Sequence, residues 1–180
     1  MYKIIAPLIL FVFVALFFTA CENASTTPTP EVEVISFNPL GMYSFPGDTT
    51  PVGMDTVTFK VWNYVDCRIK HMSYVYYGVK SGNTVTPTYN IDLDVYLRGG
   101  NQDTVGSNVT HVYNLWLETD KALDYMYSND DNTVAEITFS GEDDYDKGKT
   151  FTCNKIYYAL IKTPTSGKKI KILPVSIGGE

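Results

Sequence analysis

The chain has 180 residues, of which 44% are hydrophobic and 19% are charged, and its formal net charge is −6 at pH 7. This length suits one domain with a sizeable hydrophobic core. The acidic balance speaks against nucleic acid as a partner, because binding phosphates requires clustered Lys and Arg side chains.

The N-terminal segment has the pattern of an export signal. Lys3 precedes a run without polar side chains from Ile4 to Phe18. This run is shorter than the roughly 20 apolar residues that span a bilayer, and its length is typical of the apolar region of a signal peptide. The sequence Phe18-Thr19-Ala20-Cys21 follows. It resembles the lipobox of bacterial lipoproteins, in which a small residue precedes a cysteine that is acylated before the signal is cut away.

The resemblance implies that residues 1–20 form a lipoprotein signal peptide and that Cys21 carries the lipid. The segment departs from the family at Phe18, where Leu is most common, and at Thr19, where Ala or Ser is usual. The alternative is an uncleaved N-terminal anchor helix, and both interpretations hold the domain at a membrane. Family members with Asp after the cysteine are often retained in the inner membrane. Because Glu22 stands here, the resemblance favours the outer membrane or the cell surface.

A short tether is predicted to follow the lipidated cysteine. Residues 21–31 read CENASTTPTPE, with no apolar side chain larger than Ala after the cysteine. Such a segment cannot bury a core and is expected to be extended. At about 3.1 Å per residue, it holds a domain roughly 30 Å from the bilayer.

From Val32 onward, alternation with a period of two residues predicts an all-β domain over residues 32–180. Lys121–Tyr127 is predicted to be a helical turn or a bulged extension, and Met42–Gly53 to be irregular or an edge. A shift in apolar parity near Asn154-Lys155 predicts a β-bulge. The predicted strands are Val32–Phe37, Asp55–Tyr64, Ile69–Val79, Ile91–Leu97, Val109–Glu118, Ala135–Phe139, Thr150–Ile161 and Lys169–Ile177.

Seven to nine short strands at this spacing predict an antiparallel β-sandwich. The stretch Ala135 to Thr150, AEITFSGEDDYDKGKT, is similar to the late hairpin of immunoglobulin-like and fibronectin-like modules of bacterial surface proteins. The resemblance covers roughly Val32 to Ile161 and implies an immunoglobulin-like fold. The Cys-Trp-Cys arrangement of antibodies is not matched, because Cys67 lies after the strand that carries Trp62. A small closed barrel or a jelly roll is the alternative.

Cys67 and Cys153 are the two cysteines of the predicted domain. In an exported domain such a pair is a candidate for a disulfide. The alternative is two separate reduced thiols, and both interpretations stay open, because a bridge requires Cα atoms within about 7 Å of each other.

The sequence carries little that points to catalysis. It has two histidines, His71 and His111, and no nucleophile elbow, zinc-binding helix motif or Gly-rich phosphate loop. His111 shares the parity of the apolar residues of its strand, so we expect a core or edge histidine with a satisfied hydrogen bond. We therefore predict that the protein is not an enzyme and needs no cofactor.

An acidic loop is the candidate for a cation site. Calcium takes six to eight oxygen ligands, which a loop rich in carboxylates can supply. The alternative is plain turn chemistry, because Asp, Asn and Gly favour turns by themselves. The candidate ligands are Glu142, Asp143, Asp144 and Asp146, and Asn129–Asn132 is a second cluster of this kind.

Aromatic residues are the candidates for a ligand-binding face. Five of them fall on the parity opposite the aliphatic residues of their strands, and exposed rings suit sugar stacking and protein interfaces. The alternative is that a second layer covers these rings as a satellite core. The five residues are Trp62, Tyr74, Tyr76, Tyr96 and Trp116.

Three functions are compatible with these features. The first is a non-catalytic protein-interaction or adhesion module, held at the cell envelope by an N-terminal lipid. The second is a carbohydrate-binding surface lipoprotein that captures polysaccharide, which requires Trp62 and Trp116 to be exposed together. The third, an envelope hydrolase, is disfavoured by the missing nucleophile and metal motifs.

Overall fold

The computed structural model describes residues 28–45, 47, 52–100, 108–145 and 148–163. The predicted signal peptide, Cys21, most of the tether and the last predicted strand, Lys169–Ile177, lie outside these residues. None of the helices in the described ranges is long and apolar enough to span a membrane.

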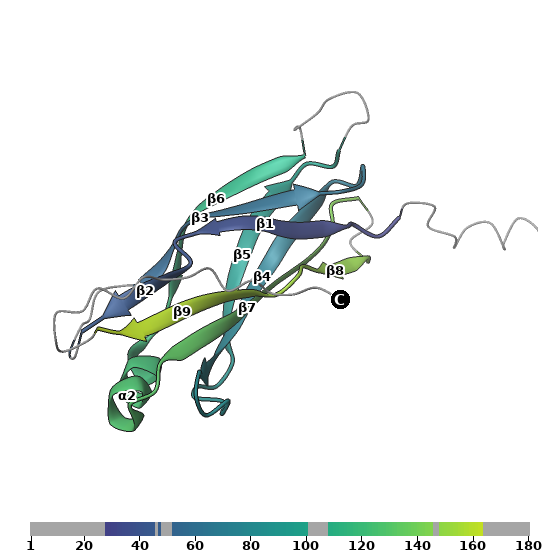
Figure 1. Cartoon of the computed structure of the whole chain (residues 1–180). Coiled ribbons are helices and arrows are strands. Elements are labelled where there is room, and N and C mark those ends of the chain that lie inside the picture. Colours follow the sequence, from purple (N-terminus) through teal and green to yellow (C-terminus); the bar gives the residue numbers. More distant parts are fainter. Residues whose placement is uncertain (1–27, 46, 48–51, 101–107, 146–147, 164–180) are drawn as a thin grey trace, which may run out of the picture.

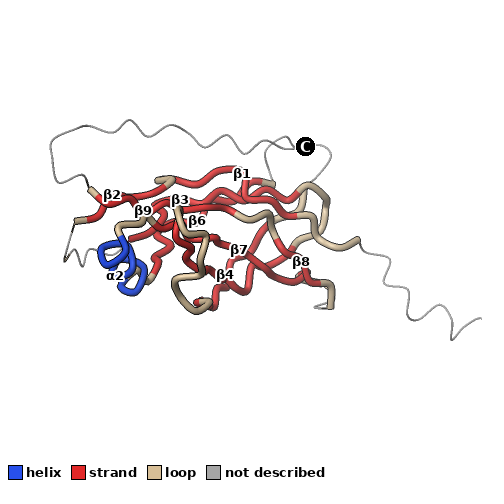
Figure 2. The backbone as a smooth tube through the Cα atoms, turned by 60° about the horizontal axis from the view of Figure 1, so that its bottom comes forward, coloured by secondary structure: helices blue, strands red, loops and turns tan. Residues whose placement is uncertain are grey.

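The described chain forms two sheets that share one hydrophobic core (Figures 1 and 2). Sheet A has the strand order β1-β3-β6, and sheet B has the order β2-β9-β7-β4-β5, with β8 also paired to β7. All neighbouring strands are antiparallel except β2 and β9, which are parallel. The all-β prediction is confirmed. The strands are β1 Val32–Asn38, β2 Gly41–Ser44, β3 Val52–Val61, β4 Cys67–Gly78, β5 Tyr89–Leu97, β6 Val109–Leu117, β7 Thr133–Asp143, β8 Thr150–Thr152 and β9 Ile156–Lys162.

The core lies between the sheets and is built from alternate residues of each strand. In β7 every second residue from Thr133 to Asp143 is buried, which is the pattern of a strand with one face on a core. Phe59 of β3 and Phe139 of β7 meet edge to face across the two sheets, with ring centroids 5.0 Å apart. Burial of such large apolar side chains is the main force that holds the sheets together.

Sheet A changes parity in the middle of β6. Asn114 has a φ of 59°, a left-handed conformation that Asn tolerates better than most residues. Before it, His111 and Tyr113 point outward and are exposed, whereas Leu115 and Leu117 after it are buried. The prediction that His111 shares a face with the apolar residues of its strand is therefore wrong for Leu115 and Leu117. His111 lies on an edge strand, and its Nδ1 is 3.1 Å from Thr58 Oγ1.

A second irregularity, the bulge predicted near Asn154-Lys155, is confirmed. The pairing of β7 with β8 and its pairing with β9 differ by one residue in register, and Asn154 lies in the break between the two strands. Its side chain accepts a hydrogen bond from Val34 N–H at 2.7 Å and donates one to Val34 C=O at 3.1 Å. The Asn154 amide thus imitates a strand neighbour for β1 and links the two sheets.

One helix, α2 (Asp120–Asn129), connects β6 to β7, so the helical alternative for Lys121–Tyr127 is correct. Its buried residues Ala122, Leu123 and Met126 join the core. Asp130 ends the helix with a φ of 49°. In Figure 1, α2 lies at one end of the molecule, and β8 and the start of β1 lie at the other.

Candidate functional site

A bulge in β4, the strand between β5 and β7, places several charged side chains outward. The register of β4 with both neighbours shifts between Ile69 and His71, so that Lys70 and His71 both lie on the outer face. Gly141 of β7 makes room for this bulge. A Cβ at that position would clash with the carbonyl oxygen of Arg68, which is rigid backbone, and would meet the Phe151 ring.

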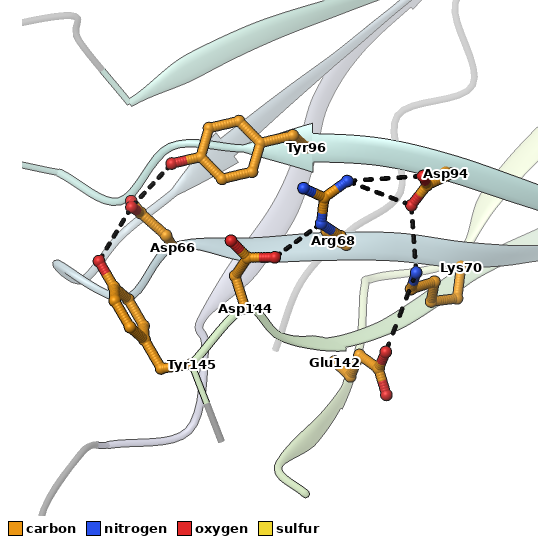
Figure 3. Close-up of polar contacts among 8 residues, drawn as sticks. All are labelled: Asp66, Arg68, Lys70, Asp94, Tyr96, Glu142, Asp144 and Tyr145. Atoms are coloured by element: carbon orange, nitrogen blue, oxygen red, sulfur yellow. Dashed lines mark hydrogen bonds and ion pairs between the residues drawn. The ribbon is translucent and has the colours of Figure 1, made fainter. Parts of the chain in front are cut away.

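The basic residues of the bulge are paired with carboxylates on both neighbouring strands (Figure 3). We call this surface the bulge face and define it by Arg68, Lys70, His71, Asp92, Asp94, Tyr96, Glu142 and Asp144. Arg68 Nε lies 2.6 Å from Asp144 Oδ1, and Lys70 Nζ lies 3.1 Å from Asp94 Oδ1. Wider ion pairs join Arg68 to Asp94 at 3.4 Å and Lys70 to Glu142 at 3.9 Å. His71 Nδ1 lies 3.0 Å from Asp92 Oδ1.

The ion pairs stabilise the charged forms of these side chains. The hydrogen bond from Lys70 lowers the pKa of Asp94, and the hydrogen bond to Asp144 raises the pKa of Arg68. The result is a row of cations on β4 between carboxylates on β5 and β7. Because these side chains are substantially exposed, the pairs are screened by solvent and can exchange partners at little cost.

Asp66 closes one end of the bulge face (Figure 3). Its carboxylate accepts hydrogen bonds from Gly99 N–H at 2.7 Å, Tyr96 OH at 2.7 Å and Tyr145 OH at 3.1 Å. Partial burial alone would raise the pKa of Asp66, but these hydrogen bonds outweigh burial and the pKa is lowered. The same contact with Asp66 raises the pKa of Tyr96 to about 12. Asp66 thereby orients two exposed tyrosine rings, of which Tyr96 lies against Arg68.

The bulge face contains two shallow depressions of about 320 and 360 Å³, and Lys70 and Glu142 line both of them. These volumes are at the lower limit of small-molecule pockets, and most of the residues that line them are polar or charged, whereas such pockets are mainly apolar. The arrangement therefore suits a partner that lays charged side chains across the strands.

The predicted aromatic face is not formed as one surface. Tyr74 and Tyr76 are 2% and 0% exposed and belong to the core, so they cannot stack on a ligand. Trp62, Tyr96 and Trp116 are exposed. Tyr96, however, lies on sheet B, whereas Trp116 lies on sheet A and Trp62 directly follows β3 of sheet A.

The bulge in β4 explains why Tyr74 and Tyr76 were misplaced. Strict alternation from Ile69 puts even-numbered residues on the outer face. The bulge at Lys70 inserts one residue. The residues that point inward are therefore Ile69 before the bulge and Met72, Tyr74 and Tyr76 after it.

The two tryptophans are far apart along sheet A. Trp116 pairs with Gly53 near the start of β3, whereas Trp62 directly follows the end of β3. Nine residues of strand separate these positions, which corresponds to roughly 30 Å. Both tryptophans are thus exposed, as the carbohydrate-binding alternative expects, but they are separated along sheet A.

The described part of the acidic loop does not assemble into a calcium site. Glu142 and Asp143 are consecutive residues of β7 and point to opposite faces, and Asp144 binds Arg68. Asp146 lies outside the described residues. Within the described ranges, no group of three or more His, Cys, Asp or Glu side chains could hold a metal ion.

The second acidic cluster serves a turn. Asp131 is 4% exposed, and its carboxylate accepts hydrogen bonds from the N–H groups of Lys80 at 2.8 Å and Ser81 at 3.2 Å. Asn132 Oδ1 accepts a hydrogen bond from Lys162 N–H at 2.9 Å. These contacts fix the loop after β4 and the end of β9 beside α2, as the turn interpretation expects.

Cys67 and Cys153 are both buried free thiols, so the disulfide is not formed. Cys67 pairs with Asp143 on one side of β7, and Cys153 N–H donates to Phe139 C=O on the other side. Two strand spacings of about 4.8 Å already exceed the Cα separation of about 7 Å that a disulfide tolerates. Burial raises the pKa of both thiols to about 12, which makes them weak nucleophiles.

The sequence could have pointed to the bulge face through one signal only, the outward alternation of Asp92, Asp94 and Tyr96 in β5. Arg68, Lys70 and Asp66 were missed because the carboxylates and hydroxyl groups that they contact come from distant strands and loops. The proposed lipid carrier, Cys21, lies outside the described residues.

Comparisons with known proteins leave the chain without a family. No family model matches the sequence, and no curated protein matches it. Among solved structures, the chain is similar to the solution structure of a protein described as late embryogenesis abundant (LEA). The sequence identity is 16% and the TM-score is 0.40, over 87% of this chain and 85% of that chain. At this TM-score the likeness carries no argument about function.

Proposed function

We propose that this chain is a lipid-anchored lipoprotein of the bacterial cell envelope, whose immunoglobulin-like domain binds a protein partner through the bulge face without catalysis. The lipid at Cys21 would hold the domain at the outer membrane or the cell surface. The proposal combines the N-terminal sequence pattern with the geometry of sheet B.

The strand order supports the immunoglobulin-like part of the proposal. In such sandwiches, strands A, B and E pair in one sheet, and strands C, F and G pair in the other. Here β1, β3 and β6 pair in sheet A, and β4, β7 and β9 pair in the same manner in sheet B. This order of strands favours the immunoglobulin-like or fibronectin-like fold over a closed barrel or a jelly roll.

The observation that carries the proposed binding role is the composition of the bulge face. Arg and Tyr are enriched at the energetically important positions of protein interfaces. Arg68, Tyr96 and Tyr145 lie together and are oriented by Asp66 and Asp144. A partner with complementary charges can replace the ion pairs of Arg68 and Lys70 and gain electrostatic specificity.

The test is site-specific crosslinking in living cells. A photo-reactive amino acid replaces Tyr145, which is 70% exposed beside the bulge face, or Tyr113, which is 63% exposed on sheet A. We expect one covalent adduct from position 145 and none from position 113. The double variant Arg68→Ala/Lys70→Ala should remove the adduct. Lys121→Ala on the exposed side of α2 should leave it unchanged.

Two results would contradict the binding role. One is an adduct that forms equally well from position 113. The other is an adduct from position 145 that survives in the Arg68→Ala/Lys70→Ala variant with undiminished yield.

Lipidation and location are tested separately. Cys21→Ala should abolish incorporation of a labelled fatty acid, and equal labelling of this variant and the wild type would refute the lipid anchor. Protease treatment of intact cells should degrade the domain if it lies on the cell surface. Its survival until lysis would place it inside the envelope.

A further inference from the structure

The chain enters the fold beside two exposed aromatic residues of the loop between β3 and β4. Glu31 C=O accepts a hydrogen bond from Trp62 N–H at 2.8 Å, and Thr29 C=O accepts one from Asn63 Nδ2 at 2.8 Å. The last residues of the predicted tether are thus fixed to the loop between β3 and β4. Trp62 is 55% exposed and Tyr64 in the same loop is 65% exposed.

Trp62 is held in place by charged neighbours. Lys60 Nζ lies 3.4 Å from the centroid of the indole ring, and Trp62 Nε1 donates a hydrogen bond to Glu33 Oε2 at 2.8 Å. The ring therefore has an ammonium group on its face and a carboxylate at its edge. One charge of each sign beside an indole suits a zwitterionic lipid headgroup, and Trp and Tyr are the residues enriched at membrane–water interfaces.

We propose that Lys60, Trp62 and Tyr64 dock onto the headgroup layer of the membrane that holds the lipid anchor, with zwitterionic phospholipid as the ligand. This proposal rests on the proposed lipidation of Cys21. Pro28, where the described chain begins, follows Cys21 by seven positions, so that the tether spans at most roughly 25 Å. A short tether makes docking an intramolecular step with an effective concentration in the millimolar range. Weak interfacial affinity is then sufficient.

The opposite end of sheet A supplies the control. Trp116 is also 55% exposed, but it lies roughly 30 Å from Trp62 along β3. Docking through the loop between β3 and β4 brings Trp62 to the lipid and leaves Trp116 in water.

The experiment uses the full chain, produced in a bacterium and reconstituted into phosphatidylcholine vesicles whose acyl chains are brominated near the headgroup. Bromine quenches tryptophan fluorescence at short range. Trp116→Phe leaves Trp62 as the only fluorescent tryptophan, and Trp62→Phe leaves Trp116. Flotation of the vesicles establishes attachment of each variant, and circular dichroism establishes folding.

We expect both variants to float with the vesicles, at least twofold quenching of Trp62 and no quenching of Trp116. Flotation without quenching of Trp62 would overturn docking and leave the lipid anchor intact. Quenching of Trp116 alone or of both residues equally would overturn the proposed orientation. Failure to float would overturn the lipid anchor and the docking that depends on it.

Discussion

The two ends of the molecule each use one aspartate as the acceptor of several hydrogen bonds, but the donors differ. Asp131, at the α2 end, accepts from the backbone N–H groups of Lys80 and Ser81. Asp66, at the end where the chain enters the fold, accepts from one backbone N–H and from the hydroxyl groups of Tyr96 and Tyr145.

This difference decides at which end the aspartate can exchange its hydrogen-bond partners. A backbone N–H can only donate, so the carboxylate of Asp131 cannot be replaced without leaving a donor unsatisfied. A tyrosine hydroxyl can donate or accept and can rotate. The hydrogen bonds of Asp131 at the α2 end are therefore structural. The hydroxyl groups at the Asp66 end can form hydrogen bonds with other groups instead.

The largest loss of stability is expected at Gly141, where the bulge in β4 leaves no space for a side chain. Gly141→Ala places a methyl group against the Arg68 carbonyl, and we expect the free energy of unfolding to fall by about 3 kcal/mol. Urea unfolding measures this loss. Gly100→Ala is the matched control, because a Cβ there meets its nearest atom at 3.4 Å, an ordinary contact. Equal effects of both variants would show that the bulge tolerates a side chain.

The same substitution at the two aspartates tests the comparison directly. Asp131→Asn keeps one acceptor and turns an amide NH₂ toward a backbone N–H, so the melting temperature should fall by roughly 5 °C. Asp66→Asn should lower it by less than roughly 2 °C, because the tyrosine hydroxyls can accept hydrogen bonds from the amide. Calorimetry measures both values, and a larger loss for Asp66→Asn would reverse the assignment of the two ends.

A smaller effect concerns the titration of Tyr96. Its hydrogen bond to Asp66 raises the pKa of Tyr96 from 10.0 to about 12. The unfolded chain releases this proton near pH 10, so the contact stabilises the fold below pH 10, and this contribution is lost as the pH rises to about 12. Asp66→Asn should return the titration of Tyr96 toward pH 10. The ultraviolet absorbance of phenolate measures the titration, and Tyr96→Phe identifies the part of the absorbance change that belongs to Tyr96. If Asp66 is not the cause of the raised pKa, Asp66→Asn should leave that part unchanged.

The smallest effect on stability is expected from the ion pairs of the bulge face. Lys70→Ala should change the free energy of unfolding by less than about 1 kcal/mol, because Lys70 and Asp94 are 33% and 64% exposed. Urea unfolding in low and high salt measures this contribution. A large, salt-dependent loss would indicate that these charges serve stability, in contrast to the role in binding proposed for them.

The sequence predicts those parts of the fold that repeat regularly and misses those that depend on an irregular residue. Alternation correctly identified β5, β7 and the buried face of β3 around Phe59. It failed at Asn114 and Lys70, because one left-handed or inserted residue reverses the face of every residue after it. The bulge at Asn154 was found, since apolar residues mark both sides of the shift.

The candidate site shows the same division. Asp94 and Tyr96 could be assigned to a solvated face from β5 alone. The pairing of Arg68 with Asp144 joins residues 76 positions apart, and no local pattern encodes it. The separation of Cys67 and Cys153 across β7 likewise depends on strand order, which the spacing of cysteines does not reveal.

The parallel pairing of β2 with β9 has a consequence for how the chain acquires its structure. Gly41 pairs with Ala159, and Val34 binds the side chain of Asn154, 120 residues later. Contacts between such distant residues slow folding, because a long loop must close before they form. The pairing of β2 therefore depends on β9, and a chain that emerges from its N-terminal end cannot complete sheet B until residues up to Lys162 have emerged.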